Sequence, residues 1–254
     1  MKVIILAAGR GTRLKDSTKN IPKSLVKLNN NTLISYQIKN YKINRCKRIY
    51  ISTGYKSYCF DNLHLKKIYN RKYQSTNMVY TLINTLKKIK HDEDLIISYG
   101  DILFNSIILK KLINSREQFT VVVDLNFLNL WNKRFINPIK DLETLKIKKN
   151  KILEIGNRPN DLNDIEGQYL GLIKINKKFI KKFINFFENF DTFNPHTTID
   201  KNNISMTSFI NLMIKNKYQV TSLNIKNGWL EVDNQSDLKK YQYYNLINKY
   251  KINL

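Results

Sequence analysis

The sequence predicts an α/β fold built on a mostly parallel sheet. Apolar runs of strand length recur at 3–7, 48–53, 95–99 and 119–123. Stretches with apolar residues at helical spacing lie between these runs, one over 32–41 and one from 78 to about 90. Strands that alternate with helices in this way form βαβ units with right-handed connections, and such units make parallel sheets.

The first strand leads directly into a basic turn that contains Gly9 and Gly11. An open α/β sheet has its ligand crevice at the carboxyl ends of its strands. Small residues let the backbone approach a ligand closely, and successive N–H groups in such a turn form a concavity that binds anions. Because Arg13 and Lys23 add two mobile positive charges, the pattern predicts a polyphosphate site at this turn.

Two common phosphate-binding loops do not fit the turn. The dinucleotide fingerprint requires a third small residue three places after the second glycine, where this chain has Leu14. The ATPase loop requires Gly-Lys-Ser/Thr after a four-residue gap, and Gly9 and Gly11 do not supply it.

Two further stretches place polar side chains at strand or helix ends. Asp101 follows the strand 95–99, where its carboxylate would face the crevice, and Mg²⁺ requires only one or two carboxylates besides substrate phosphates. The alternative is that Asp101 caps the next helix, over 107–114.

Ser75 and Asn77 precede the helix from 78, whose N-terminus suits a nucleotide base or phosphate. Capping of that helix is their alternative role.

The second half of the chain changes in pattern after a strand that ends on Asp124. Residues 125–139 show no clear periodicity, 143–147 and 151–155 alternate like a hairpin, and 168–175 form another strand. Helices at 177–190 and 206–217, a strand at 218–225 and a closing helix from 236 follow. We expect a single domain over 1–254, with about 125–170 as an elaboration of it.

Composition leaves the chain basic but otherwise ordinary. The formal charge of +24 comes from 44 Lys and Arg against 20 Asp and Glu, and taken alone it suggests a nucleic-acid or anionic-surface binder. The lysines are spread over the whole chain without a basic tail or a known nucleic-acid module, so this reading ranks low. With only two cysteines, the chain is predicted to be cytoplasmic. It has no long apolar run, which predicts no membrane span, and its first strand begins at residue 3, which predicts no cleavable signal. The oligomeric state stays open, a homodimer included.

Several motifs carry a resemblance to a known family. Residues 6–14 together with 22–25 resemble the opening of the nucleotidyltransferases that activate sugars and small phosphorylated alcohols. Residues 77–80 are similar to the same place in cytidylyltransferases for phosphocholine or 2-aminoethylphosphonate. Trp131, Arg134, Pro138 and the segments 141–146, 167–172 and 228–233 resemble the nucleotidyltransferase domain often fused to phosphoenolpyruvate mutases, so that the likeness covers essentially the whole chain.

This resemblance implies a fold and a reaction. The fold would be a three-layer α/β sandwich with a mixed, mostly parallel central sheet, like that of nucleotide-diphospho-sugar transferases, and residues 125–170 would form a lid or acceptor-binding hairpin region. The reaction would be Mg²⁺-dependent transfer of CMP from CTP to a small phosphonate or phosphomonoester, of 2-aminoethylphosphonate or phosphocholine type, with release of pyrophosphate. The alternatives are a sugar-1-phosphate nucleotidyltransferase that uses UTP or dTTP and, more distantly, the nucleic-acid binder.

The resemblance also implies roles for residues. Asp101 and Asp233 would hold the magnesium ion, while Lys23 and Arg13 would act on the phosphates as catalytic residues. The nucleotide would bind along the turn and at the start of the helix from 78. These nucleotide-binding residues are Leu6, Ala7, Ala8, Gly9, Arg10, Gly11, Thr12, Ser75 and Asn77.

An acceptor with an ammonium or trimethylammonium group requires carboxylates and aromatic faces nearby. The candidates follow the central strands or lie in the inserted region, although core packing is the usual role of each aromatic and Glu143 and Glu166 could equally be surface acids. They are Tyr99, Asp124, Trp131, Arg134, Glu143, Glu166, Tyr169, Trp229 and Glu231.

Overall fold

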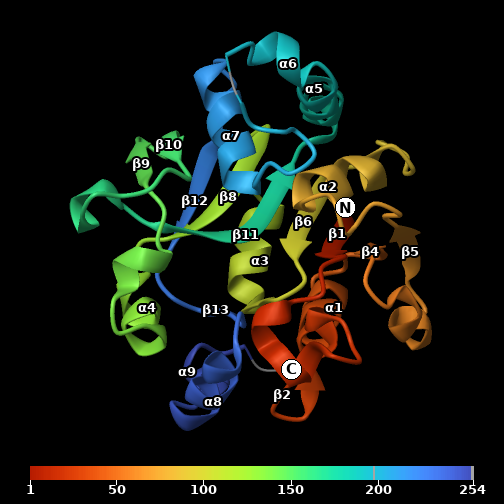
Figure 1. Cartoon of the computed structure of the whole chain (residues 1–254), viewed down its shortest axis with the longest axis vertical. Helices are drawn as coiled ribbons and strands as arrows, with labels where there is room; N and C mark the ends of the chain where they lie inside the picture. The colour runs from red at the N-terminus through yellow and green to blue at the C-terminus, as the bar shows by residue number, and fades with distance from the viewer. Residues whose placement is uncertain (197, 253–254) are drawn as a thin grey trace.

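A nine-stranded sheet forms the centre of the molecule in a computed structural model that describes residues 1–196 and 198–252 (Figure 1). Its strand order is β5-β4-β1-β6-β11-β8-β12-β10-β9. The first four strands in this order are parallel, β8 and β12 are parallel to each other, and β11 is antiparallel to both of its neighbours. The prediction of a mixed, mostly parallel sheet is therefore confirmed.

The strands of the main sheet are β1 (Lys2–Ala7), β4 (Arg48–Thr53), β5 (Lys66–Tyr69), β6 (Leu95–Tyr99), β8 (Phe119–Asp124), β9 (Leu145–Lys148), β10 (Lys151–Ile155), β11 (Gln168–Ile175) and β12 (Thr221–Ile225). Two small antiparallel pairs are β2 (Lys27–Leu28) with β3 (Asn31–Thr32) and β7 (Ile102–Phe104) with β13 (Trp229–Glu231). The helices are α1 (Leu33–Ile43), α2 (Met78–Leu86), α3 (Ser106–Ile113), α4 (Leu128–Arg134), α5 (Lys177–Glu188), α6 (Phe190–Phe193), α7 (Met206–Lys215), α8 (Gln235–Tyr243) and α9 (Leu246–Lys249).

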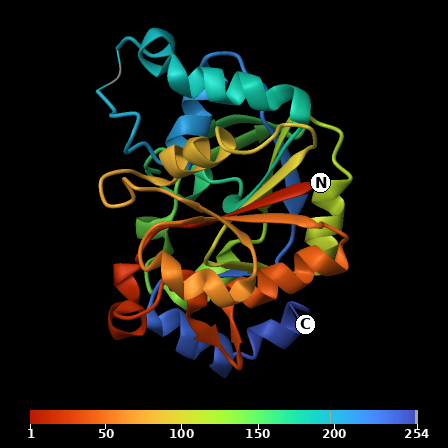
Figure 2. The same ribbon diagram turned by 90° about the vertical axis from the view of Figure 1, so that its right-hand side faces the viewer.

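Helices cover both faces of the sheet, which gives three layers (Figures 1 and 2). All six residues of β1 are buried. Val3 and Ile5 pack in the cluster that includes α1, α3, α4 and α8, whereas Ile4 and Leu6 pack in the cluster that includes α2, α5 and α7. A central parallel strand is apolar on both faces because both faces are covered, which explains the continuous apolar run of β1.

The pair formed by β7 and β13 brings distant acids together. Glu231 lies opposite Ile102, the residue after Asp101, and the N–H of Val232 donates to the carbonyl of Asp101 at 3.0 Å. The short pairing thus joins the carboxyl end of β6 to the segment that contains Glu231 and Asp233.

The structure differs from the predicted elements in a few places. Helix α2 ends at Leu86 instead of near 90, and the closing helix is split into α8 and α9 at Asn245, which has φ 47°. Helix α4 was not predicted, because its seven residues carry buried side chains of mixed type instead of a regular apolar stripe. Within residues 1–196 and 198–252, every helix is too short or too polar to span a bilayer.

The predicted hairpin is present as β9 and β10. It continues the main sheet at one edge, since Lys151 of β10 pairs antiparallel with Thr221 of β12. Its function as a lid stays a prediction.

Candidate active site

The turn after β1 is held in shape by backbone geometry. Gly11 has φ 76°, a left-handed conformation that glycine adopts without strain. Its carbonyl accepts hydrogen bonds from the N–H of Leu14 at 3.0 Å and the hydroxyl of Thr18 at 2.9 Å. At Gly9 a Cβ would meet no atom within 4 Å, so the space beside the turn is open.

Gly11 also sets the path of the predicted catalytic lysine. A Cβ built on Gly11 would lie 2.6 Å from Cβ of Lys23 and 2.8 Å from its Cγ and Cδ. The lysine side chain therefore crosses directly over the turn, and only the missing side chain at position 11 leaves room for it.

A pocket of about 260 Å³ opens at the carboxyl ends of β1 and β6. It contains most of the predicted nucleotide-binding residues together with both predicted catalytic residues and Asp101. The lining residues are Leu6, Ala7, Ala8, Gly9, Gly11, Arg13, Lys23, Ser24, Tyr73, Thr76, Asn77, Met78, Thr81, Tyr99, Gly100 and Asp101.

Three predicted nucleotide-binding residues lie outside this lining. Arg10 is exposed and its guanidinium lies over the ring of Tyr55, 5.4 Å from the centroid. Ser75 is exposed, with its hydroxyl 3.4 Å from the carbonyl of Lys72, and Thr12 is exposed at the start of a 3₁₀ helix. Their role in nucleotide binding stays a prediction.

Asn77 has the capping role that was considered for it, and its position leaves the nucleotide-binding role open. It is the N-cap of α2, where its side chain accepts from the N–H of Met78 at 2.7 Å, and it also lines the pocket. Its side-chain amide donates to the carbonyl of Asn203 at 3.1 Å, which ties α2 to the segment before α7.

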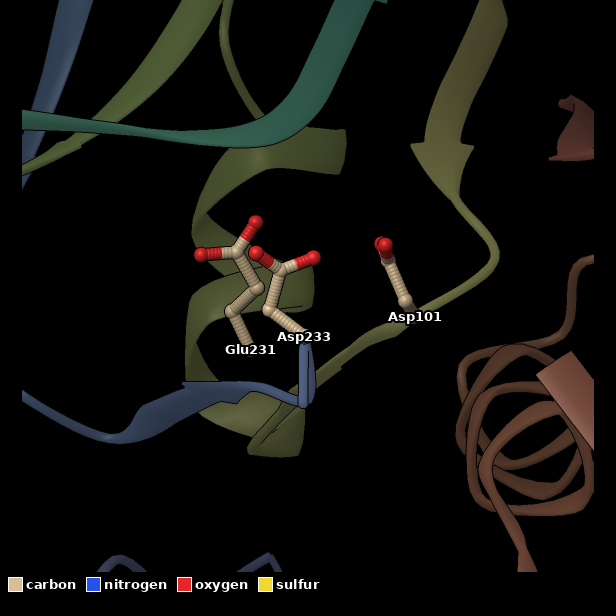
Figure 3. Close-up of side chains that lie close together, drawn as sticks. All are labelled: Asp101, Glu231 and Asp233. Atoms are coloured by element: carbon tan, nitrogen blue, oxygen red, sulfur yellow. The ribbon is translucent and has the colours of Figure 1, made fainter. Parts of the chain in front are cut away.

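Three carboxylates lie close together, and one of them, Asp101, lines the pocket (Figure 3). Asp101 comes from the loop after β6, and Glu231 and Asp233 come from β13 and the residues after it. Each residue offers one oxygen, and these oxygens lie within 4.8 Å of one another. The capping alternative for Asp101 is excluded, because α3 is capped by Asn105.

Two cations contact these carboxylates. Nζ of Lys23 lies 2.5 Å from Oδ2 of Asp101 and 2.6 Å from Oδ1 of Asp233, and the guanidinium of Arg13 pairs with the other oxygen of Asp233. Burial lowers the pKa of Lys23, but the charges of Asp101, Asp233 and Glu231 outweigh burial and raise it above its ordinary value. Lys23 is therefore fully charged at neutral pH.

Burial is the main cause that raises the pKa of Glu231, to about 6. Arg134 opposes this rise, whereas the charges of Asp101 and Asp233 add to it. Three acids so close together repel one another, and this repulsion is offset when cations approach them.

The carboxylate cluster has the donor chemistry that a hard divalent cation requires. Mg²⁺ binds oxygen ligands and is usually held by one or two carboxylates together with substrate phosphates. Oδ1 of Asp101 is buried and has no hydrogen-bond partner among the described residues, so a lone pair is available at the site. The residues present therefore fit a magnesium ion.

A buried guanidinium supports the segment that carries the acids. Arg134 of α4, whose side chain is 0% exposed, donates from Nη1 to Glu231 at 2.9 Å and from Nε to Asp237 at 3.1 Å. Asp237 in turn accepts the N–H of Asp233 at 2.8 Å and that of Asn234 at 3.1 Å. Arg134, predicted to bind the acceptor, is instead an internal partner of Glu231 and Asp237.

Three other predicted acceptor residues are part of the core. Trp131 and Trp229 are each 1% exposed and pack against each other with ring centroids 5.8 Å apart. Asp124 is fully buried and accepts three hydrogen bonds at 2.9 Å, from the N–H groups of Asn126 and Asn227 and from the indole of Trp229. The indole of Trp131 donates to Asp141 at 3.2 Å. The structure corrects the prediction that these three face a ligand, since their polar atoms and aromatic faces have partners inside the protein.

The remaining acceptor candidates lie in different surroundings, some inside the protein and one on its surface. Tyr99 lines the pocket and contacts Tyr169 edge-on, with centroids 5.8 Å apart, and Glu143 is half-buried and accepts from Thr207 at 3.2 Å. Burial raises the pKa of Glu143. Glu166 is exposed and accepts from the N–H of Ile147 at 2.7 Å, so it supports the hairpin from outside.

Two groups at the site were missed from the sequence. Asp237 is part of a capping box with Asn234, and the spacing of Asn234 and Asp237 before a helical run is a recognisable signal. The side chains of Ser24, Tyr73, Thr76 and Thr81 line the pocket without a motif of their own that marks a ligand contact.

The geometry agrees with the comparisons to known proteins. Residues 3–153 match the MobA-like NTP transferase domain. The chain belongs to this family. It is a nucleotidyltransferase, with the glycine turn, Lys23 and Asp101 in the matched part.

Three relatives illustrate the similarity. The nucleotidyltransferase is 38% identical over 249 residues to CTP:phosphoglutamine cytidylyltransferase of Campylobacter jejuni, which covers 94% of this chain and 98% of that protein. It is 44% identical over 86 residues to choline-phosphate cytidylyltransferase of Streptococcus pneumoniae, covering 32% of this chain and 38% of the relative. The solved structure of CTP:phosphocholine cytidylyltransferase from Streptococcus pneumoniae superposes with a TM-score of 0.72 over 96% of this chain and 98% of that one, at 22% identity. This last likeness shows the fold.

Proposed function

We propose that this nucleotidyltransferase transfers CMP from CTP to a small acceptor that carries a phosphate or phosphonate, and releases pyrophosphate. The observation that carries the proposal is that the glycine turn, Lys23 and Asp101 line one pocket, with oxygens of Glu231 and Asp233 within 4.8 Å of Asp101. The names of the Campylobacter and Streptococcus relatives support CTP as the donor and a phosphorylated small molecule as the acceptor.

The reaction makes few demands on acid–base chemistry. An acceptor oxygen forms a bond to the α-phosphorus of CTP, and the bond between that phosphorus and the bridging oxygen breaks as pyrophosphate leaves. Because the acceptor oxygen is already anionic, no strong general base is needed. The protein must align two negatively charged groups and balance the charge that develops on the leaving oxygen.

The residues of the pocket supply both requirements. The small residues from Ala7 to Gly11 let the triphosphate lie against backbone N–H groups. Lys23 and Arg13 direct their charges at the same space, and both are within ion-pair distance of Asp233. Asp101 and Asp233, with Glu231 beside them, would hold Mg²⁺, which when bound neutralises phosphate charge.

The test is a substrate panel. Purified protein is incubated with CTP, UTP, dTTP or ATP, in Mg²⁺ and with phosphocholine, 2-aminoethylphosphonate, O-phospho-L-serine or glucose 1-phosphate, while pyrophosphate is measured. We expect release with CTP and one of the first three acceptors. Consumption of UTP or dTTP with glucose 1-phosphate would instead identify a sugar nucleotidyltransferase, and no release with any pair would contradict nucleotidyl transfer to this class of acceptor.

A further inference from the structure

Both aspartates of the candidate metal site are paired with cations of the chain itself. Nζ of Lys23 lies 2.5 Å from Oδ2 of Asp101 and 2.6 Å from Oδ1 of Asp233. The guanidinium of Arg13 pairs with Oδ2 of Asp233, so both oxygens of this carboxylate have a cationic partner. Any cation that binds to Asp233 therefore has to replace one of these two partners.

The ammonium of Lys23 lies where a bridging ion has to lie. A cation held by Asp101 and Asp233 together is located between their carboxylates, and Nζ contacts one oxygen of each. Mg²⁺ requires its oxygen ligands at about 2.0–2.1 Å. Two positive charges at contact distance from the same oxygens repel each other strongly. Lys23 and a divalent cation therefore compete for this position.

The same ammonium can also reach the space for the triphosphate. Lys23 lines the pocket together with Gly9 and Gly11 of the turn. Its Cβ, Cγ and Cδ atoms lie close against Gly11, which holds the first part of the side chain in place. Rotation about the last two carbon–carbon bonds still moves Nζ. The ammonium can therefore turn from the carboxylates to phosphates in the pocket while its stem stays fixed.

Lys23 differs from the other two cations at the cluster. The Arg13 side chain is 69% exposed, and an ion pair with an exposed partner contributes little. The Arg134 side chain is 0% exposed and pairs with both Glu231 and Asp237, so it is held in place. Lys23, 13% exposed and in contact with two carboxylates, is the strong competitor that is able to move.

We propose that Lys23 is a built-in competitor of the divalent cation and is drawn away from the carboxylates by the triphosphate. The inference rests on the proposed function, because it takes the carboxylate cluster as the cation site, and it adds the order of loading. Without nucleotide, the ammonium neutralises Asp101 and Asp233, and a free divalent cation binds weakly. Phosphate oxygens in the pocket attract the ammonium, and the released carboxylate oxygens then accept the cation. Nucleotide and cation therefore bind cooperatively, each raising the affinity of the other by the same factor.

The test removes the competitor and measures cation binding without nucleotide. The probe is Mn²⁺, which prefers oxygen ligands as Mg²⁺ does and whose free concentration is measured by electron paramagnetic resonance. Lys23→Met keeps a long unbranched side chain but has no charge. We expect it to lower the Kd for Mn²⁺ about tenfold or more, within the usual range of coupling between two sites. Damage to the fold would weaken binding, so an increase in affinity has no merely structural explanation.

Three further variants locate the effect. Arg13→Met should lower the Kd for Mn²⁺ by no more than about fivefold, because its ion pair is exposed. Lys27→Met, which removes an exposed lysine of β2, is the matched control and should leave the Kd unchanged. In the double variant of Lys23→Met with Asp233→Asn, the increase in affinity should be lost, because a carboxylate of the cluster is missing.

The outcomes separate this proposal from the proposed function, since the titration contains neither CTP nor acceptor. An Mn²⁺ affinity of Lys23→Met that is unchanged, weaker or below detection overturns the competition, and pyrophosphate release in the substrate panel would still establish nucleotidyl transfer. An equal increase in Lys27→Met, or an increase that persists in the double variant, also overturns it, because the ion then responds to overall charge or binds elsewhere. A tenfold increase confined to Lys23→Met supports the competition even where no substrate pair yields pyrophosphate and the proposed function fails.

Discussion

The nucleotide side and the acceptor side of this molecule are built differently. On the nucleotide side, Gly9 and Asp101 follow the ends of β1 and β6, and both line the pocket together with Lys23. On the side where the sequence predicts acceptor residues, the aromatic residues Trp131 and Trp229 are in the core, and the charged group of Arg134 is buried in ion pairs.

The difference teaches where a functional residue can be recognised. A ligand that contacts backbone and strand ends imposes a local pattern on the sequence, because the sheet fixes those positions. A ligand that contacts side chains of loops and a hairpin imposes no local pattern. In such a region, a buried aromatic residue or ion pair stabilises the surrounding fold without contacting a ligand.

The largest effect should come from the internal ion pair of the acceptor side. Arg134→Met leaves the buried Asp237 without its cation, and breaking a buried pair costs about 3–5 kcal/mol of unfolding free energy. Urea denaturation checks this, with the exposed Arg116→Met as the control. A loss below about 1 kcal/mol, typical of exposed pairs, would mean that Arg134 is not a structural partner and would reopen its role as an acceptor ligand.

The next largest effect should come from the nucleotide side, while the protein stays folded. Lys23→Ala and Asp101→Ala should each lower kcat by about 10²–10³, or about 3 kcal/mol in the barrier, since each removes a charge that acts on the transferring phosphates. Pyrophosphate release measures kcat, and circular dichroism verifies folding. Lys27→Ala, an exposed lysine of β2, should retain full activity. Release at the wild-type rate by either variant would remove that residue from the mechanism.

Ligand addition should stabilise the nucleotide side only when a divalent cation is present. At a CTP concentration 100 times its Kd, binding should raise the unfolding free energy by about 2.7 kcal/mol. We expect this increase in Mg²⁺, measured by denaturation with and without CTP, and its loss in excess chelator or in Asp233→Ala. An equal increase in chelator would show that the carboxylate cluster does not take part in nucleotide binding.

The smallest effect should distinguish core packing from acceptor contact. Trp229→Phe removes one of three donors to the buried Asp124 and should cost about 1–3 kcal/mol of unfolding free energy. KM for the acceptor should be unchanged, because the ring is 1% exposed and packs against Trp131. A raised KM with unchanged stability would restore the sequence-based reading of Trp229 as an acceptor residue.

Much of the fold was predictable because buried strands and helix caps are local signals. The strand over 3–7 and the helix over 32–41 were predicted from the sequence and are confirmed, and Thr32 is the N-cap of that helix. Helix α4 was not, since a seven-residue helix that contacts the core with Trp131 and buries Arg134 has no regular stripe.

The candidate site was predictable only in part. The turn and Asp101 lie near one another because strand ends meet at one edge of a sheet, which a sequence pattern can indicate. The neighbourhood of Glu231 and Asp233 depends on the pairing of β7 with β13, and that of Arg134 and Asp237 on the packing of α4 with α8. Tertiary contacts of this kind leave no periodic trace in the chain.

Gly11 restricts how this chain can vary. Because its φ is positive, even alanine at this position would distort the turn. A Cβ would also lie 2.6–2.8 Å from carbon atoms of the Lys23 side chain, so it would push the ammonium away from Asp101 and Asp233. Residue 11 has no functional group of its own, yet its lack of a side chain determines where the Lys23 ammonium lies. The proposed reaction therefore depends on the absence of a side chain at position 11.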